Sequence, residues 1–226
     1  MKYSNIKEAR FISRPNRFIA NIEMDGKIQV CHVKNTGRCK ELLVPNATVF
    51  VQESDNRHRK TKYDLISVYK GNRLVNVDSQ IPNKVFEEWV RAENIFHNIS
   101  LIKAEATYKN SRFDFYIEAD GKKVFVEVKG VTLEIDGVAL FPDAPTERGV
   151  KHIKELCKCL DDGYEAYLVF IIQMKNVKYF APNAETHKEF AETLKTAKKK
   201  GVNMIAVDCE VTKNSIVAKD YVEVKI

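Results

Sequence analysis

The sequence predicts an all-β barrel of the OB kind over residues 1–80, joined to an α/β domain over residues 81–226 in which helices flank a mixed sheet. Three observations predict this. Short strand patterns fill the first 80 residues without a convincing helix, a helix pattern opens at Pro82, and strand and helix patterns follow from there to the end. The chain has 226 residues, 44% hydrophobic and 30% charged, which suits one large or two small folded domains and excludes a disordered or low-complexity chain.

The first domain contains six expected strands separated by turns. Five or six short strands in about 80 residues predict a small closed or nearly closed barrel, with a sandwich fragment as the alternative. Asp25-Gly26 and Gly71-Asn72 are tight-turn signals. A two-residue turn at Asp25-Gly26 would set Ile22 against Gln29 and mismatch the apolar faces, so we expect that turn to be bulged or longer. The expected strands span 9–13, 17–24, 27–33, 47–53, 63–69 and 73–77.

The second domain opens with a helix at Pro82, where proline is tolerated in the first turn and apolar residues follow at i, i+3, i+4 spacing. Residues 168–172 are apolar on both faces, as a central strand covered by helices on both sides requires. Gly163 and Gly201 stand where glycines end helices. We expect strands over 101–108, 112–119 and 122–129, a helix over 146–160, a strand over 166–173, a helix over 184–200, a strand over 203–211, and two short strands near 215–218 and 221–225.

Composition excludes several classes of protein. The five cysteines are an odd number without a C-x-x-C pair, which argues against a disulfide framework and a zinc finger. The histidine spacings of zinc hydrolases and deaminases are absent, so any metal must be held by carboxylates. No apolar stretch reaches membrane-span length, and the first seven residues lack a signal-peptide core. We expect a cytoplasmic protein with no membrane partner and no organic cofactor.

The formal net charge of +6 is unevenly distributed. Residues 1–80 hold 15 Lys and Arg against 8 Asp and Glu, whereas the remainder holds 22 against 23. This asymmetry points to a polyanion-binding module, with a merely soluble basic surface as the alternative. The candidate phosphate contacts lie in two basic loops of the barrel and at one helix start: Lys34, Arg38, Lys40, Arg57, Arg59, Lys60, Lys62 and Arg148.

The strongest hairpin signal in the chain is Asp120-Gly121. If these two residues form the turn, cross-strand partners have numbers that sum to 241, so Asp114 faces Glu127 and Lys129 lies diagonal to Asp114. The same alternation places Phe113, Phe115 and Ile117 on one face with Val124, Val126 and Val128.

Opposed carboxylates require compensation, because two of them about 5 Å apart at an effective dielectric near 20 repel by roughly 3 kcal/mol. A divalent cation held by Asp114 and Glu127 would supply it, as would the Lys129 ammonium or a proton on one acid. In the functional interpretation, Mg²⁺ or Mn²⁺ polarises a phosphodiester and activates water while Lys129 orients the water or steadies negative charge. The alternative is a salt-bridged patch of exposed strand. Asp143 is a candidate cap or metal ligand.

Three blocks of the sequence, over residues 111–115, 126–133 and 141–153, together with Asn35-Thr36-Gly37, resemble the sugar fermentation stimulation protein A family over essentially the whole chain. The resemblance implies an OB-like domain followed by a PD-(D/E)xK restriction-endonuclease-like domain, in proteins described as DNA-binding and linked to regulation of maltose and other sugar use. It implies that Asp114 and Glu127 bind metal, that Lys129 is the motif lysine and that Glu88 is the additional catalytic carboxylate, with Glu105 as its rival. Phe113 stands where the namesake motif has proline.

Two functional hypotheses follow. As a binding module, the protein would contact the DNA backbone largely without sequence preference, with affinity that falls steeply with salt and without turnover. As an enzyme, it would cut DNA only with Mg²⁺ or Mn²⁺. A general RNA-binding barrel with a structural second domain is a third, weaker interpretation.

Overall fold

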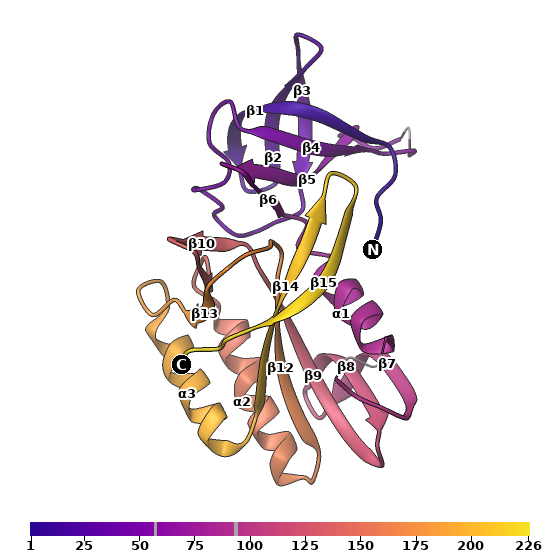
Figure 1. Cartoon of the computed structure of the whole chain (residues 1–226), viewed down its shortest axis with the longest axis vertical. Helices are drawn as coiled ribbons and strands as arrows, with labels where there is room; N and C mark the ends of the chain where they lie inside the picture. Colours follow the sequence, from indigo (N-terminus) through magenta and orange to yellow (C-terminus); the bar gives the residue numbers. More distant parts are fainter. Residues whose placement is uncertain (57, 93–94) are drawn as a thin grey trace.

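The computed structural model describes residues 1–56, 58–92 and 95–226. The barrel lies at one end of the molecule and the α/β domain at the other, with the β14–β15 hairpin (Asn203–Thr212 and Ser215–Val222) reaching back toward the barrel (Figure 1). The predicted two-part fold, an OB-like barrel followed by a mixed-sheet α/β domain with helices, is confirmed.

The barrel is a six-stranded sheet in the order β3-β2-β1-β4-β5-β6, and a parallel pairing of β3 with β5 closes it. Its long first strand pairs with both β2 and β4, and its register shifts near Ser13 let it bend between them. Alternate side chains such as Phe11, Ile22 and Leu65 point inward and are buried. The strands are β1 (Ile6–Asn16), β2 (Ile19–Met24), β3 (Lys27–Val33), β4 (Thr48–Glu53), β5 (Tyr63–Lys70) and β6 (Arg73–Asn76).

The turn at Asp25-Gly26 corrects one expectation. It is a tight two-residue turn after all, with positive φ at both residues and Ile22 paired with Gln29. The mismatch of apolar faces is tolerated because Ile28 on β3 is exposed to solvent, while Ile22 stays in the core. The inference failed because it assumed that every apolar residue of β3 must be buried.

The second domain is built on a six-stranded mixed sheet in the order β15-β14-β12-β9-β8-β7. Helix α1 (Pro82–Arg91) covers one face, and α2 (Glu147–Asp161) and α3 (Lys188–Lys200) cover the other (Figure 1). Residues of β12 alternate between the two faces, so that Val169 packs toward α1 and Phe170 toward α2 and α3. The remaining strands of this sheet are β7 (Ile99–Tyr108), β8 (Ser111–Ala119), β9 (Lys122–Val131) and β12 (Glu165–Ile172).

Several predicted elements of this domain need correction. A small sheet of β10 (Leu133–Ile135), β11 (Val138–Phe141) and β13 (Tyr179–Pro182) was not predicted, because strands this short carry little periodicity. Helix α3 begins at Lys188 rather than 184, after an N-cap at His187. The two expected terminal strands are one strand, β15. The side chain of Thr146, rather than the expected candidate Asp143, caps α2 by accepting from the Gly149 amide.

The junction between the domains is hydrogen-bonded. Gln173 follows β12 and is 1% exposed, and its Nε2 donates to the carbonyls of Asn76 and Asp78 and to Oδ1 of Asn76. Residues 1–3 fall within the predicted first domain, but the Tyr3 amide donates to Asn214 O, so this end of the chain contacts the β14–β15 hairpin. Within the described residues, every helix is too short or too polar to span a membrane.

Candidate metal centre and nucleic-acid interface

The turn at Asp120-Gly121 has the predicted register. Both residues have positive φ, and the paired residues of β8 and β9 sum to 241 from Ala119–Lys122 to Phe115–Val126. The ladder ends there, one position before Asp114 and Glu127. The Val128 amide donates to Asp114 Oδ2 at 2.7 Å, so a side chain takes the place of a backbone partner. The two acids therefore lie where β8 and β9 begin to diverge.

Phe113 breaks the expected alternation of faces. It packs against Phe125 and the His152 ring, on the α2 side of the sheet, whereas Phe115 packs against Phe86 of α1. The prediction that Phe113 and Phe115 share a face is wrong because it extended a regular pleat through the end of the β8–β9 ladder.

Glu127 is the most deeply buried member of the site, with 2% of its surface exposed. Its Oε1 accepts from the Lys129 ammonium and lies 2.5 Å from His152 Nδ1. Burial raises the pKa of this carboxyl, but the hydrogen bond from His152 and the charge of Lys129 outweigh burial and hold the pKa below its usual value. Glu127 is therefore ionised at neutral pH.

The second oxygen of Glu127 is without a partner. Among the described residues, no donor reaches Oε2, although this atom is inaccessible to solvent. A buried anionic oxygen without a donor is costly, because it has lost water and gained nothing in return.

Asp114 completes the acid pair. Its Oδ1 accepts from Asn83 Nδ2 of α1 at 2.8 Å, and its Oδ2 accepts from the Val128 amide. Burial, and then the negative charge of Glu127, raise the pKa of this carboxyl. The charge of Glu127 thus acts on the pKa of Asp114, whereas His152 and Lys129 lower the pKa of Glu127.

These residues fit a hard divalent cation. Mg²⁺, Mn²⁺ and Ca²⁺ take oxygen ligands, and the unpartnered Glu127 Oε2 offers one without displacing any hydrogen bond of Glu127. Lys129 alone leaves this oxygen unsatisfied. The donor set suits Asp114 and Glu127 as ligands.

Glu88 does not join this group. It is exposed on α1, and its carboxylate lies 2.5 Å from the Met1 ammonium. The helix residue that reaches the acids is instead Asn83, because the start of α1 packs against β9: a Cβ at Gly130 would lie 2.6 Å from Pro82. The rival Glu105 is exposed on β7 and pairs with Arg112. Asp143 neither caps α2 nor joins the acids; its Oδ2 accepts from the Cys39 amide across the domain junction.

His152 and Asn83 are the site residues that sequence reasoning missed. His152 stands four residues after Arg148, a spacing that puts both on one face of α2, and Arg148 Nε donates to His152 Nε2 at 3.4 Å. That bond leaves the proton of a neutral ring on Nδ1, where it faces Glu127. The helical spacing was visible in the sequence, but the partner strand was not.

The predicted phosphate-binding residues separate into two groups. Lys34 pairs with Asp64 and Asp78, Arg59 forms a two-pronged contact with Asp64, and Lys62 pairs with Glu53, so these three are engaged within the barrel. The second group is exposed and, within the described chain, forms no side-chain ion pair: Arg38, Lys40 and Lys60. Arg148 is also exposed. Arg57 lies outside the described residues.

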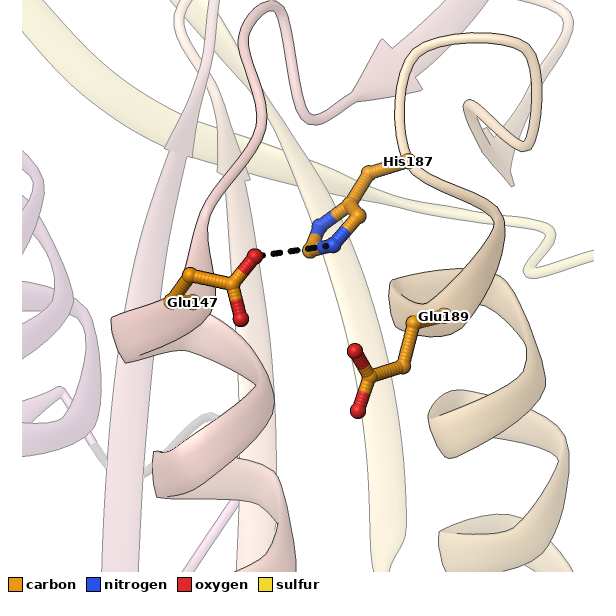
Figure 2. A group of neighbouring side chains, drawn as sticks. All are labelled: Glu147, His187 and Glu189. Carbon is orange, nitrogen blue, oxygen red and sulfur yellow. Dashed lines mark ion pairs between the residues drawn. The ribbon is translucent and has the colours of Figure 1, made fainter.

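A second group of possible metal ligands lies at the starts of α2 and α3. Figure 2 shows Glu147, His187 and Glu189 facing one another, with an ion pair between Glu147 and His187. The Thr146 amide donates to His187 Nδ1, so the neutral ring carries its proton on Nε2, the atom directed at Glu147. Glu189 pairs with Lys154. These contacts tie the two helices together, and the group needs no metal.

The fold and the site define a class of protein: an OB barrel joined to a mixed-sheet α/β domain that carries two acids and a lysine at a fork between strands. Two family models match the chain. Residues 12–77 match an N-terminal OB domain, and residues 80–215 match the sugar fermentation stimulation protein RE domain. The chain belongs to the sugar fermentation stimulation protein family.

Relatives of high similarity cover the whole chain. A sugar fermentation stimulation protein homolog of Desulfitobacterium hafniense is 64% identical over 100% of this chain and 99% of the relative, and that of Clostridium beijerinckii is 62% identical over 99% of each. A solved structure of Pyrococcus furiosus SfsA in complex with Ca²⁺ is 30% identical, covers 100% of this chain and 98% of that chain, and has a TM-score of 0.90.

Proposed function

We propose that this protein binds DNA through its phosphate backbone and hydrolyses phosphodiester bonds with a divalent metal held by Asp114 and Glu127. One observation carries the proposal: Glu127 Oε2 is buried and lacks a donor in the described part of the chain, in a carboxylate whose charge acts on Asp114. The similar P. furiosus protein was solved with Ca²⁺, a cation of the same oxygen-seeking kind, which supports a metal here.

The chain's own residues have separable tasks. Asp114 and Glu127 present ligand oxygens, and a bound metal would supply Lewis-acid polarisation of the phosphate and a lowered pKa for water. Lys129 pairs with Glu127 and offers a positive charge for negative charge that develops on the phosphate. His152 donates from Nδ1 to Glu127 and fixes its orientation, and Asn83 does the same for Asp114.

Contact with DNA would be largely independent of sequence. The exposed cations Arg38, Lys40 and Lys60 lie on loops of the barrel, where backbone phosphates rather than base edges are the natural partners. The engaged residues Lys34, Arg59 and Lys62 support the fold of the barrel and are not part of this proposal.

The second candidate is DNA binding without turnover, in a protein that regulates sugar use as the names of its relatives suggest. The position of Glu88 favours it, because within the described residues the site then holds two acids and an asparagine rather than three acids. Cytoplasmic location belongs to both proposals.

Cleavage separates the two candidates. Purified protein is incubated with duplex and single-stranded DNA, with and without Mg²⁺ or Mn²⁺, beside Asp114→Ala and the control Glu88→Gln. We expect metal-dependent products from the wild type and Glu88→Gln and none from Asp114→Ala. Tight binding by all three proteins without products would refute the enzyme and leave the binding protein.

A further inference from the structure

A basic hollow lies next to the metal centre. Its walls come from the turn between β7 and β8, with Ser111 and Arg112, and from the first turns of α2, with Arg148, Lys151 and His152, and its volume is about 480 Å³. The His152 ring forms a shared wall, since it lines the hollow and donates from Nδ1 to Glu127. The hollow and Glu127 are thus separated by a single imidazole.

The cations of the hollow lack strong counterions. Within the described residues, Lys151 and Arg148 form no ion pair, and Arg148 donates one hydrogen bond, to His152. Arg112 lies 3.4 Å from Glu105, but both side chains are more than half exposed, so water screens this pair. The single carboxylate in the lining, Glu147, lies 3.5 Å from His187. Three cations therefore face the hollow against one carboxylate in its lining.

Ser111 provides an independent observation. It is 6% exposed, lines the hollow, and its Oγ has no hydrogen-bond partner in the part of the chain that the structure describes. A buried hydroxyl is normally satisfied, and a ligand in the hollow would supply the acceptor once the Ser111 side chain rotates toward it. An anion with several acceptor oxygens satisfies both the hydroxyl and the cations.

We propose that this hollow binds a backbone phosphate of the DNA strand, next to the phosphate that faces Asp114 and Glu127. The proposal rests on the proposed function, because it assigns the substrate strand a second fixed point beside the same site. Arg148 and Lys151 supply charge, Ser111 supplies a hydroxyl donor, and the start of α2 adds its favourable dipole. Fixing a neighbouring phosphate would orient the scissile one, which is how positioning residues accelerate such reactions.

The test measures binding without metal, so that it does not depend on cleavage. Fluorescence anisotropy of a labelled DNA duplex in EDTA, over a series of salt concentrations, compares wild type with Lys151→Gln and Arg148→Gln. We expect each variant to bind about threefold or more weakly and to lower the slope of log affinity against log salt by about one. The matched control Lys195→Gln removes an exposed lysine from the middle of α3 and should leave affinity and slope unchanged.

Ser111→Ala separates binding from folding. Since its hydroxyl lacks an internal partner, we expect unchanged or higher thermal stability together with weaker DNA binding. Lower stability with unchanged binding would show that the hydroxyl supports the fold and would count against the proposal.

The outcomes distinguish this proposal from the proposed function. If the wild type binds DNA and Lys151→Gln and Arg148→Gln match the control, the hollow is not a phosphate site although DNA binding stands. If the wild type binds no DNA, the proposed function fails. Calorimetric titration with inorganic phosphate and with a mononucleotide then tests whether the hollow binds phosphate at all. If the wild type binds phosphate and Arg148→Gln does not, the hollow is a phosphate site for a small ligand. If the wild type binds no phosphate, the proposal of a phosphate site is overturned.

Discussion

Metal-dependent stabilisation is the most direct test of the acid pair. The perturbation is Asp114→Asn, which removes one of the two anionic ligands and keeps the size of the side chain. Glu147→Gln is the control, because it removes a carboxylate from the Glu147, His187 and Glu189 group, which the structure explains without metal. A metal that binds only the folded state stabilises it by mass action.

The magnitude follows from the loss of a metal ligand. Removing a group that only orients a ligand typically weakens metal affinity about 10- to 100-fold, so removing an anionic ligand should weaken it about a hundredfold, or about 2.7 kcal/mol. At a metal concentration of about 100 times the wild-type Kd, stabilisation is about 2.7 kcal/mol, or roughly 5–11 °C in Tm for a chain of this size. The same concentration would give Asp114→Asn only about 0.4 kcal/mol, or ~1 °C.

The assay is thermal unfolding followed by circular dichroism, with Mn²⁺ titrated into each protein. We expect a concentration-dependent rise in Tm for the wild type and Glu147→Gln, and nearly none for Asp114→Asn. An equal rise in Asp114→Asn would refute the assignment of Asp114 as a ligand. Loss of the rise in Glu147→Gln alone would move the metal to the starts of α2 and α3.

Three further predictions concern stability and pH. Burial raises the pKa of Asp64, but the hydrogen bonds from Arg59 outweigh it and lower the pKa to about 2, so the ionised carboxylate contributes roughly 2 kcal/mol of stability at pH values above the unfolded pKa. Urea titrations should show that this stability is lost as the pH falls from about 4 toward 2, and that Asp64→Asn lacks this pH dependence. Gly130→Ala should cost about 1–3 kcal/mol in the same measurement, because its Cβ would lie 2.6 Å from two side-chain atoms; an unchanged midpoint would contradict the packing. His152→Ala should raise the pKa of Glu127, so on acidification the Mn²⁺-induced rise in Tm should disappear at a higher pH than in the wild type. An identical pH profile would exclude the role of His152 in lowering the pKa of Glu127.

Local patterns account for most of the fold. The pairing of β8 with β9 was predictable because the two-residue turn at Asp120-Gly121 determines which residues face each other. The helix at Pro82 was predictable because proline and apolar spacing mark a helix start. The same turn rule predicts the observed turn length at Asp25-Gly26, where the mismatch of apolar faces is present and is tolerated because Ile28 and Val30 are exposed.

The candidate site was predictable in part. Asp114, Glu127 and Lys129 come from one hairpin, so their proximity follows from its register. His152 and Asn83 come from helices that no local rule places against that hairpin, and Glu88 was chosen in place of Asn83 because it carries the expected charge. The same holds for the basic residues. From the sequence, Lys34 and Arg59 are expected to be available for phosphate, and only the structure shows that the buried Asp64 pairs with both.

By itself, the sequence determined the order of the two domains, the turns and the strand that carries an acid and a lysine two residues apart, because these depend on neighbours in the chain. Only the tertiary structure decided that β8 and β9 part at Asp114, that one oxygen of Glu127 is left without a donor, and which cations remain available. The physical reason is that desolvation and long-range hydrogen bonding depend on which elements pack together, and packing joins residues that no sequence interval connects.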